Sequence, residues 1–178
     1  MTTRKRIAVA ALTLSLSGFA GWKASEGFTE TPIIPTKGDV PTIGYGSTRY
    51  EDGTPVTLND PPITPQRAEQ LARSLHSEEE RRFRASIPGV ELFQEEYDLY
   101  LDFTGNFGIG NWRGSSMRRN LLAGRYVQAC DSLLMWRRAG GYDCSTKING
   151  QPNRRCWGVW ERQLQRHAKC LAAQGGEL

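Results

Sequence analysis

The chain has 178 residues, of which 38% are hydrophobic, and this length predicts one compact domain with a substantial core. Its net charge of +4 is unevenly spread: residues 49–102 carry twelve acids and six bases, whereas residues 112–178 carry four acids and twelve bases. The basic half is compatible with nucleic acid, with a polyanionic bacterial envelope or with a solvated surface. No phosphate-binding loop, dinucleotide-binding glycine motif or Gly-x-Ser-x-Gly elbow is present, so nothing indicates the enzyme classes that use them.

Near the N-terminus, an uncharged apolar run at residues 7–22 follows the basic cluster Arg4-Lys5-Arg6. This order is typical of an export signal whose N-terminus stays inside the cell. As a helix the run would span about 24 Å, short of the roughly 30 Å core of a bilayer. Two interpretations are open: a signal peptide cleaved after the small residues Gly18 and Ala20, or an uncleaved, weakly held membrane anchor.

The stretch at residues 26–46 predicts a helix end, then an irregular run broken by three prolines, then a strand at residues 42–46. A Glu, an Asp and a Thr on adjoining turns and strands are typical of a glycoside hydrolase. One carboxylic acid protonates the leaving sugar oxygen, and a second polar group holds a water on the other face of the ring. Glu26, Asp39 and Thr42 are therefore the candidate catalytic residues.

The next segments predict a small sheet and a long helix. Asp52-Gly53 is a strong hairpin signal within residues 48–58. Thr64 and Pro65 suit the start of a helix that ends before Pro88-Gly89. An apolar stripe marks the buried face of this helix: Ala68, Leu71, Ala72 and Leu75. The charged run at residues 78–82 is predicted to face solvent.

The remaining chain predicts helices. They cover residues 92–103, 126–136 and 157–173, with a glycine turn at residues 106–111, a cap at Ser115 or Ser116, and a helix end at residues 137–141. The inward residues of the first are predicted to be Phe93, Tyr97, Tyr100 and Leu101; those of the last, Trp157, Trp160, Leu164, Ala168 and Leu171. The two histidines, His76 and His167, are both expected at the surface.

Four cysteines occur at positions 130, 144, 156 and 170, and an even count in an exported chain predicts two disulfides. Three connectivities are possible. We favour Cys144–Cys156 with Cys130–Cys170, because the first pair brackets a polar loop and the second lies on helices that could pack together. A zinc site would need close ligand pairs such as C-x2-C, which are missing, so neither metal nor cofactor is expected.

Residues 26–46 resemble the active-site region of phage lysozymes (endolysins), where Glu-Gly, a short irregular run and Thr-Ile-Gly-Tyr-Gly occur in this order. The resemblance implies that Glu26 is the general acid and that Thr42 positions the water or the sugar. Counting back from Thr42, the family's middle catalytic position falls on Thr36. The nearest carboxylate is Asp39, which we take as the candidate base, and Asp39 is also a natural turn residue.

Other motifs extend the resemblance over most of the chain. Residues 106–110 resemble the family's glycine turn at the wall of the cleft, residues 122–130 and 136–141 resemble its closing helices, and residues 158–162 resemble its last helix. On this basis Thr36, Tyr45, Asn106 and Gly108 are candidate substrate-binding residues. The apolar run is similar to the signal-arrest-release segment of some phage endolysins, which are held inactive in the inner membrane and then released. We favour this over cleavage because Glu26 follows the run so closely.

The expected fold is therefore α+β and lysozyme-like, with a small antiparallel sheet lobe and a mainly helical lobe behind an N-terminal hydrophobic segment. Residues 1–24 would form the export and anchor segment, and residues 25–178 the catalytic domain. The expected protein is a monomeric muramidase that reaches the periplasm from the host inner membrane, binds peptidoglycan and binds no nucleic acid. Two alternatives are a lytic transglycosylase that uses the same Glu and a tethered wall-binding protein without catalysis.

Overall fold

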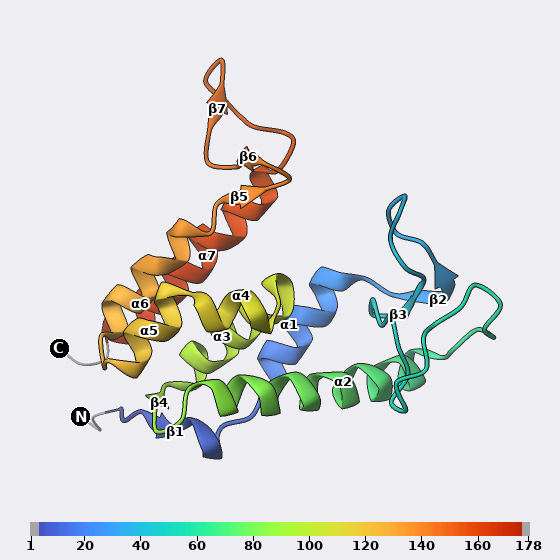
Figure 1. Cartoon of the computed structure of the whole chain (residues 1–178), viewed down its shortest axis with the longest axis horizontal. Helices are drawn as coiled ribbons and strands as arrows, with labels where there is room; N and C mark the ends of the chain where they lie inside the picture. Colours follow the sequence, from blue (N-terminus) through green and yellow to red (C-terminus); the bar gives the residue numbers. More distant parts are fainter. Residues whose placement is uncertain (1–3, 176–178) are drawn as a thin grey trace. The chain divides into compact units, whose positions relative to one another are not determined.

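The computed structural model describes residues 4–175, which form two compact units (Figure 1). The sheet unit comprises Leu14–Arg82, and the helical unit comprises residues 4–13 together with residues 83–175. Helix α2 (Pro65–Ser86) continues from the first unit into the second. The expected division into a small sheet lobe and a mainly helical lobe is thus confirmed.

The sheet unit contains α1 (Leu16–Glu26), β2 (Thr29–Ile33), β3 (Thr42–Gly44) and most of α2. Ser15 caps α1, because its Oγ accepts a hydrogen bond of 2.9 Å from the Gly18 amide. Strands β2 and β3 pair antiparallel, with Thr29 opposite Gly44 and Ile33 opposite Thr42. The prediction that the whole segment before β3 is irregular was wrong, since it contains β2. Pro32 lies inside β2 and is tolerated because both strands of a two-stranded sheet are edges.

The next part of the sheet unit, residues 48–56, forms a turn. Residues 48–56 fold back as the sequence predicts: the Val56 amide donates to the Thr48 carbonyl, and Asp52 Oδ1 accepts from the Thr54 amide. The pairing is a single bridge, Arg49 with Pro55, instead of two strands. Helix α2 has the predicted limits, and Thr64 Oγ1 accepts from the Arg67 amide at its start.

The predicted apolar stripe of α2 is buried at Ala68, Leu71 and Ala72. The prediction that residues 78–82 all face solvent was wrong at Glu80. This carboxylate is buried, and its Oε1 accepts a 2.5 Å hydrogen bond from the Leu14 amide at the beginning of the sheet unit. A buried carboxylate is tolerable when a backbone N–H satisfies it in this way.

Gly44 is where β3 meets α2 most closely. Its φ is +66°, and a Cβ added there would lie 2.9 Å from the Cβ of Ala68. We expect Gly44→Ala to lower the free energy of unfolding by about 1–3 kcal/mol, because it adds both backbone strain and overpacking. Urea unfolding measures this loss. Gly53→Ala is the control: its φ of +86° gives similar strain, but no heavy atom lies within 4 Å of the added Cβ. An equal loss in both variants would exclude the packing contribution.

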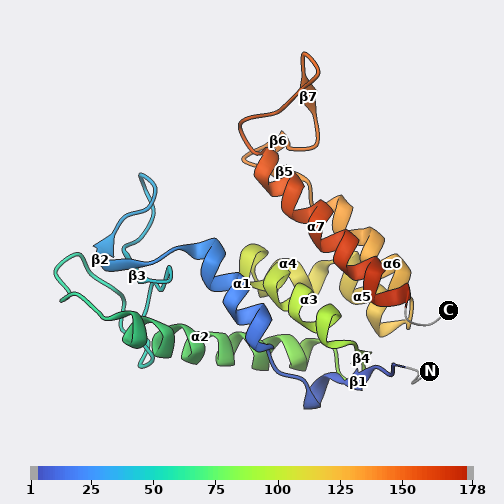
Figure 2. The same ribbon diagram turned by 180° about the vertical axis from the view of Figure 1, so that it is seen from behind.

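In the helical unit, α3 (Gln94–Phe107), α6 (Tyr126–Ser132) and η2 (Leu133–Met135) all contact the last helix, α7 (Trp157–Gln174). Helix α6 lies beside α7 in both views (Figures 1 and 2). The other elements of this unit are β1 (Ile7–Ala8), η1 (Val9–Ala11), β4 (Glu91–Leu92), α4 (Ile109–Gly114), α5 (Ser116–Leu122), β5 (Arg138–Ala139), β6 (Tyr142–Asp143), β7 (Lys147–Ile148) and β8 (Gln151–Pro152). The predicted inward residues around α3 are all buried. Ser115 caps α5, as predicted, by accepting from the Arg118 amide.

Two local predictions in this unit need correction. The glycine turn at residues 106–111 is shorter than expected: Asn106 still belongs to α3, Gly108 alone has a φ of +83°, and α4 begins at once. The segment at residues 137–141 is not only a helix end, because β5 and β6 form a hairpin around Gly140 and Gly141.

The inward face of α7 was also predicted wrongly. The buried residues are Gln163, Arg166, Cys170 and Ala173, whereas Leu164 and Leu171 are 40% and 37% exposed. Arg166 Nη2 lies 2.6 Å from Asp102 Oδ2, and its Nη1 donates to Gln163 Oε1, so the buried polar groups satisfy one another. The helix is rotated to bring Cys170 against α6, which periodicity of apolar residues cannot detect.

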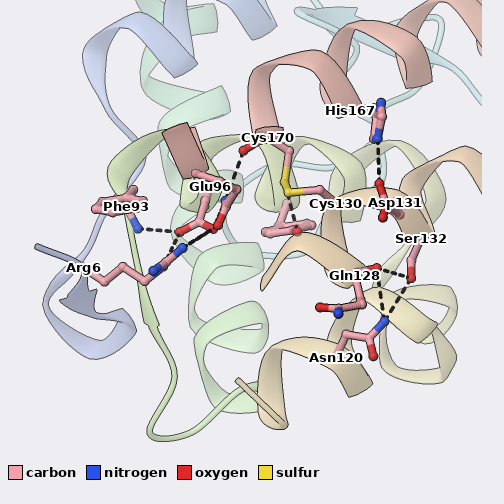
Figure 3. Close-up of a disulfide and its surroundings, with 12 residues drawn as sticks. Arg6, Phe93, Glu96, Asn120, Gln128, Cys130, Asp131, Ser132, His167 and Cys170 are labelled. Atoms are coloured by element: carbon pink, nitrogen blue, oxygen red, sulfur yellow. Dashed lines mark hydrogen bonds and ion pairs between the residues drawn. A yellow bond between two sulfur atoms is a disulfide. The ribbon is translucent and has the colours of Figure 1, made fainter. Parts of the chain in front are cut away.

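Both disulfides lie in the helical unit and have the nested connectivity. Cys130 of α6 joins Cys170 of α7 with a Cα–Cα distance of 5.5 Å (Figure 3), and Cys144 joins Cys156 across the β7–β8 hairpin. The first links two helices distant in sequence, and the second closes a loop with little apolar content. A cross-link restricts the unfolded chain, which is how such bonds stabilise a fold.

The N-terminal residues are built into the helical unit. Ile7 pairs with Leu92, Val9 and Leu12 are buried, and α1 begins only at Leu16, so residues 7–22 are not one helix here. Within residues 4–175, none of the helices combines the length and the apolar character needed to cross a bilayer.

Candidate active site

Glu26 is the last residue of α1, and Gly27, with a φ of +73°, redirects the chain into β2. The Glu26 side chain is exposed. A Cβ added at Gly46 would lie only 3.2 Å from Glu26 Oε2, so the carboxylate sits close against the backbone that follows β3. Glu26 and Gly46 are twenty residues apart in the sequence, and the structure brings their two segments together at this carboxylate.

The β2–β3 pair brings these segments together. β2 starts three residues after Glu26, and pairing of Thr29 with Gly44 returns the chain to the end of α1. Thr42 is the first residue of β3 and is half-buried, and its Oγ1 lies 3.5 Å from the Ile33 carbonyl oxygen. The β2–β3 hairpin therefore starts close to the Glu26 carboxylate and returns to it. Thr42 lies at the start of the returning strand, and Gly46 follows the end of that strand.

Thr36 and Asp39, the two candidates for the middle role, belong to one turn. The Asp39 amide donates a 2.9 Å hydrogen bond to the Thr36 carbonyl, and Gly38 between them has a φ of +95°. Both side chains are exposed. The turn uses backbone groups of both residues, so either side chain remains available for chemistry.

Tyr45 lies among aromatic rings close to the carboxylate. Its ring centroid is 5.6 Å from that of Phe28 and 6.3 Å from that of Trp22, and Lys23 Nζ lies 5.8 Å from the Tyr45 ring. Phe28 is 39% exposed. Rings of this kind can pack against the apolar faces of sugars, which is consistent with a substrate-binding role for Tyr45.

Asn106 and Gly108 belong to the helical unit. The Asn106 amide group donates to the Asp102 carbonyl at 2.9 Å and to Asp102 Oδ1 at 3.2 Å, within the last turns of α3. Gly108 separates α3 from α4, and its amide donates to the Thr104 carbonyl. Their expected role in substrate binding stays a prediction.

A network between α1 and α2 was missed at the sequence level. Lys23 Nζ lies 2.7 Å from Glu69 Oε2, and Arg73 Nη2 lies 2.8 Å from Glu69 Oε1. Hydrogen bonds from Lys23 and then Arg73 hold the pKa of the Glu69 carboxyl below its ordinary value. His76 completes the row on α2, so the prediction that it is a surface residue was wrong: its side chain is 12% exposed. The signal was present in the spacing of residues 69, 73 and 76, which lie on one helical face.

Comparison with known proteins shows which protein family has this arrangement. The family model described as phage lysozyme matches residues 23–157. The chain belongs to the phage lysozyme family. It is 30% identical to the endolysin of Salmonella phage P22 over 127 residues, which are 71% of this chain and 85% of that protein.

Solved structures agree with this assignment. The crystal structure of a P22 lysozyme mutant has a TM-score of 0.70 and 26% identity, and the match covers 90% of this chain and 99% of that one. An endolysin from Escherichia coli O157:H7 phage FAHEc1 has the same fold, with a TM-score of 0.71 and 24% identity over 90% of this chain and 94% of that one. This member of the phage lysozyme family accordingly acts in the lysis of peptidoglycan, and its fold is lysozyme-like.

Proposed function

We propose that this enzyme hydrolyses the β-1,4 bond between N-acetylmuramic acid and N-acetylglucosamine. The observation that carries the proposal is the exposed Glu26 carboxyl group held against Gly46 by the β2–β3 hairpin. In the proposed reaction Glu26 protonates the glycosidic oxygen while the bond from that oxygen to the anomeric carbon breaks. A water attacks the same carbon from the opposite face, Thr42 orients this water or the sugar, and Asp39 takes its proton.

A lytic transglycosylase could use the same Glu26. There, a hydroxyl group of the muramic acid itself attacks the anomeric carbon, so no water is consumed and no second carboxylate is required. The exposed position of Asp39 beside Thr36 favours hydrolysis, since a base is available on the hairpin that leads to Thr42.

The products distinguish these reactions. Hydrolysis leaves a reducing muramic acid end on each released fragment, whereas transglycosylation leaves an anhydro end without reducing power. We expect fragments released from purified peptidoglycan to become reducible by borohydride in proportion to the bonds cut. Anhydro ends would exclude hydrolysis, and binding to the wall without release of fragments would instead support the inactive wall-binding alternative.

The proposed route to the substrate is export through residues 1–24, retention in the host inner membrane with the N-terminus inside, and release to the periplasm as a monomer. The basic cluster before the uncharged run supports this route. We expect Gly18→Leu with Gly21→Leu to strengthen membrane retention, because two leucines make insertion more favourable. Cell fractionation should then find the protein at the inner membrane, with late lysis. A shortened soluble species from the outset would mean a cleaved signal.

Arg6 provides a second way to distinguish retention from cleavage. In the folded enzyme its Nε lies 3.1 Å from Glu96 Oε2 (Figure 3), and its Nη2 donates to Gln174 Oε1 at 2.6 Å. The two charged side chains are 9% and 0% exposed. Glu96 also accepts from the Phe93 amide and from Gln174 Nε2, so one carboxylate joins the N-terminus to α3 and α7.

We therefore expect Glu96→Gln to lower the free energy of unfolding by about 3–5 kcal/mol, the usual cost of removing one partner of a buried ion pair. Urea unfolding of the periplasmic protein measures it. If residues 1–20 are cleaved, Glu96 has lost Arg6 already, and the substitution should be neutral or stabilising. Glu95→Gln, at the exposed ion pair with Arg4, is the matched control and should change little.

A further inference from the structure

The position of Glu26 depends on how α1 docks onto α2 within the sheet unit. Four residues of α1 share one face by their spacing: Phe19, Trp22, Lys23 and Glu26. The first three contact side chains of α2. Glu26 is thus the last residue on the face of α1 that packs against α2, and any rotation of α1 about its axis would move the carboxyl group.

His76 lies at the centre of this docking. Its ring stands nearly perpendicular to the Trp22 ring, at 88° with centroids 4.2 Å apart, and to the Phe19 ring, at 82° and 5.8 Å. Edge-to-face contacts of this kind are directional, since they fix the plane of one ring relative to the other. Trp22 in turn faces Tyr45, the neighbour of Gly46, so the same ring contacts both α2 and the segment against which Glu26 rests.

The polar contacts between the two helices are more exposed than these ring contacts. Lys23 and Glu69 have side-chain exposures of 26% and 35%, and such pairs contribute little to a fixed geometry. Arg73 lies with its Cζ 4.1 Å from the Phe19 centroid, at the solvent side of the same row. The contacts of the His76 ring with Trp22 and with the buried Phe19 ring are therefore the ones that can set the rotation of α1.

We propose that His76 is a positioning residue for the general acid, acting through Trp22. The proposal rests on the proposed role of Glu26, and it assigns His76 no proton transfer and no contact with substrate. A misplacement of about 1 Å at a reacting group can cost about 10²-fold in rate, so loss of the ring should appear in kcat.

The test measures kcat and KM of folded enzyme on soluble peptidoglycan glycan fragments, well below the melting temperature. We expect His76→Ala to lower kcat by about tenfold or more with little change in KM. His76→Phe, which keeps a ring edge against Trp22, should restore kcat. Should His76→Ala fail to fold, His76→Leu replaces it, because leucine fills the volume without an aromatic edge.

The control is His167→Ala, which removes the chain's other histidine from an exposed contact with Asp131 in the helical unit and should leave kcat unchanged. Trp22→Ala should lower kcat as His76→Ala does, and the double variant should lose no more than either single one, since both residues act through one contact.

The result that overturns the proposal is a His76→Ala or His76→Leu enzyme that melts earlier but keeps its kcat, or a double variant whose losses add. Neither result touches the role of Glu26. That role fails separately, if Glu26→Gln keeps its activity.

Discussion

Glu26→Gln is expected to abolish lysis while the protein still folds. The amide keeps the shape of the side chain but cannot donate the proton that the leaving oxygen requires, and loss of a general acid typically costs about 10²–10⁴-fold in rate. Glu26 is exposed and ends its helix, so no core packing depends on its charge. Clearing of chloroform-treated cells by purified protein measures the loss, and circular dichroism measures the fold.

The matched control is Glu30→Gln. Glu30 is an exposed carboxylate in β2, four residues farther along the same chain segment, and its removal changes the net charge equally. We expect this variant to lyse cells normally. Near-normal clearing by a folded Glu26→Gln protein would contradict the assignment of Glu26 as the general acid. Another carboxyl group would then have to protonate the leaving oxygen.

The sequence alone predicts those elements whose ends carry local chemistry. Helix α2 begins and ends as expected because Thr64 and Pro65 mark its start and Pro88-Gly89 follow its end. The turn at Asp52-Gly53 and the cap at Ser115 are local in the same sense. Such features involve residues within a few positions of one another, so a single sequence contains all the information they need.

Features set by distant partners were predicted less well. The rotation of α7 is fixed by Cys170 and by the Arg166–Asp102 ion pair, both of which need partners far away in the chain. Glu80 is buried because the Leu14 amide lies opposite it. His76 is covered by two aromatic residues of α1 that belong to a segment with export character. No window of neighbouring residues contains these pairings.

The candidate site shows the same division. Glu26 and Thr42 are predicted because a recognisable pattern surrounds them, and the structure adds that the β2–β3 hairpin carries Gly46 back to the Glu26 carboxylate. The strand β2 itself was missed because three prolines indicate irregular chain. A two-stranded sheet has only edges, so proline inside it costs little, and composition alone cannot reveal that.

The middle catalytic role is decided by a pair of substitutions in one turn. An inverting hydrolase needs its two carboxyl groups about 6.5–9.5 Å apart, with room for the attacking water. Thr36 and Asp39 are joined by a backbone hydrogen bond, from the Asp39 amide to the Thr36 carbonyl, which neither Asp39→Asn nor Thr36→Val removes. Each variant therefore tests one side chain while the turn persists, and Lys37→Gln, within the same turn, is the control for the turn itself.

If Asp39 is the base, Asp39→Asn should lower the rate of bond cleavage by about 10²-fold or more, because an amide cannot accept the proton of the attacking water. Thr36→Val and Lys37→Gln should then stay close to the unmodified enzyme, and all three should melt at nearly the same temperature, since both candidate side chains are exposed. The rate is measured from the reducing ends released from peptidoglycan. If Thr36→Val loses activity while Asp39→Asn keeps it, the Thr36 hydroxyl orients the attacking water and Asp39 is only a turn residue. If neither variant loses activity, Glu26 needs no catalytic partner in this turn, which agrees with the transglycosylase reaction.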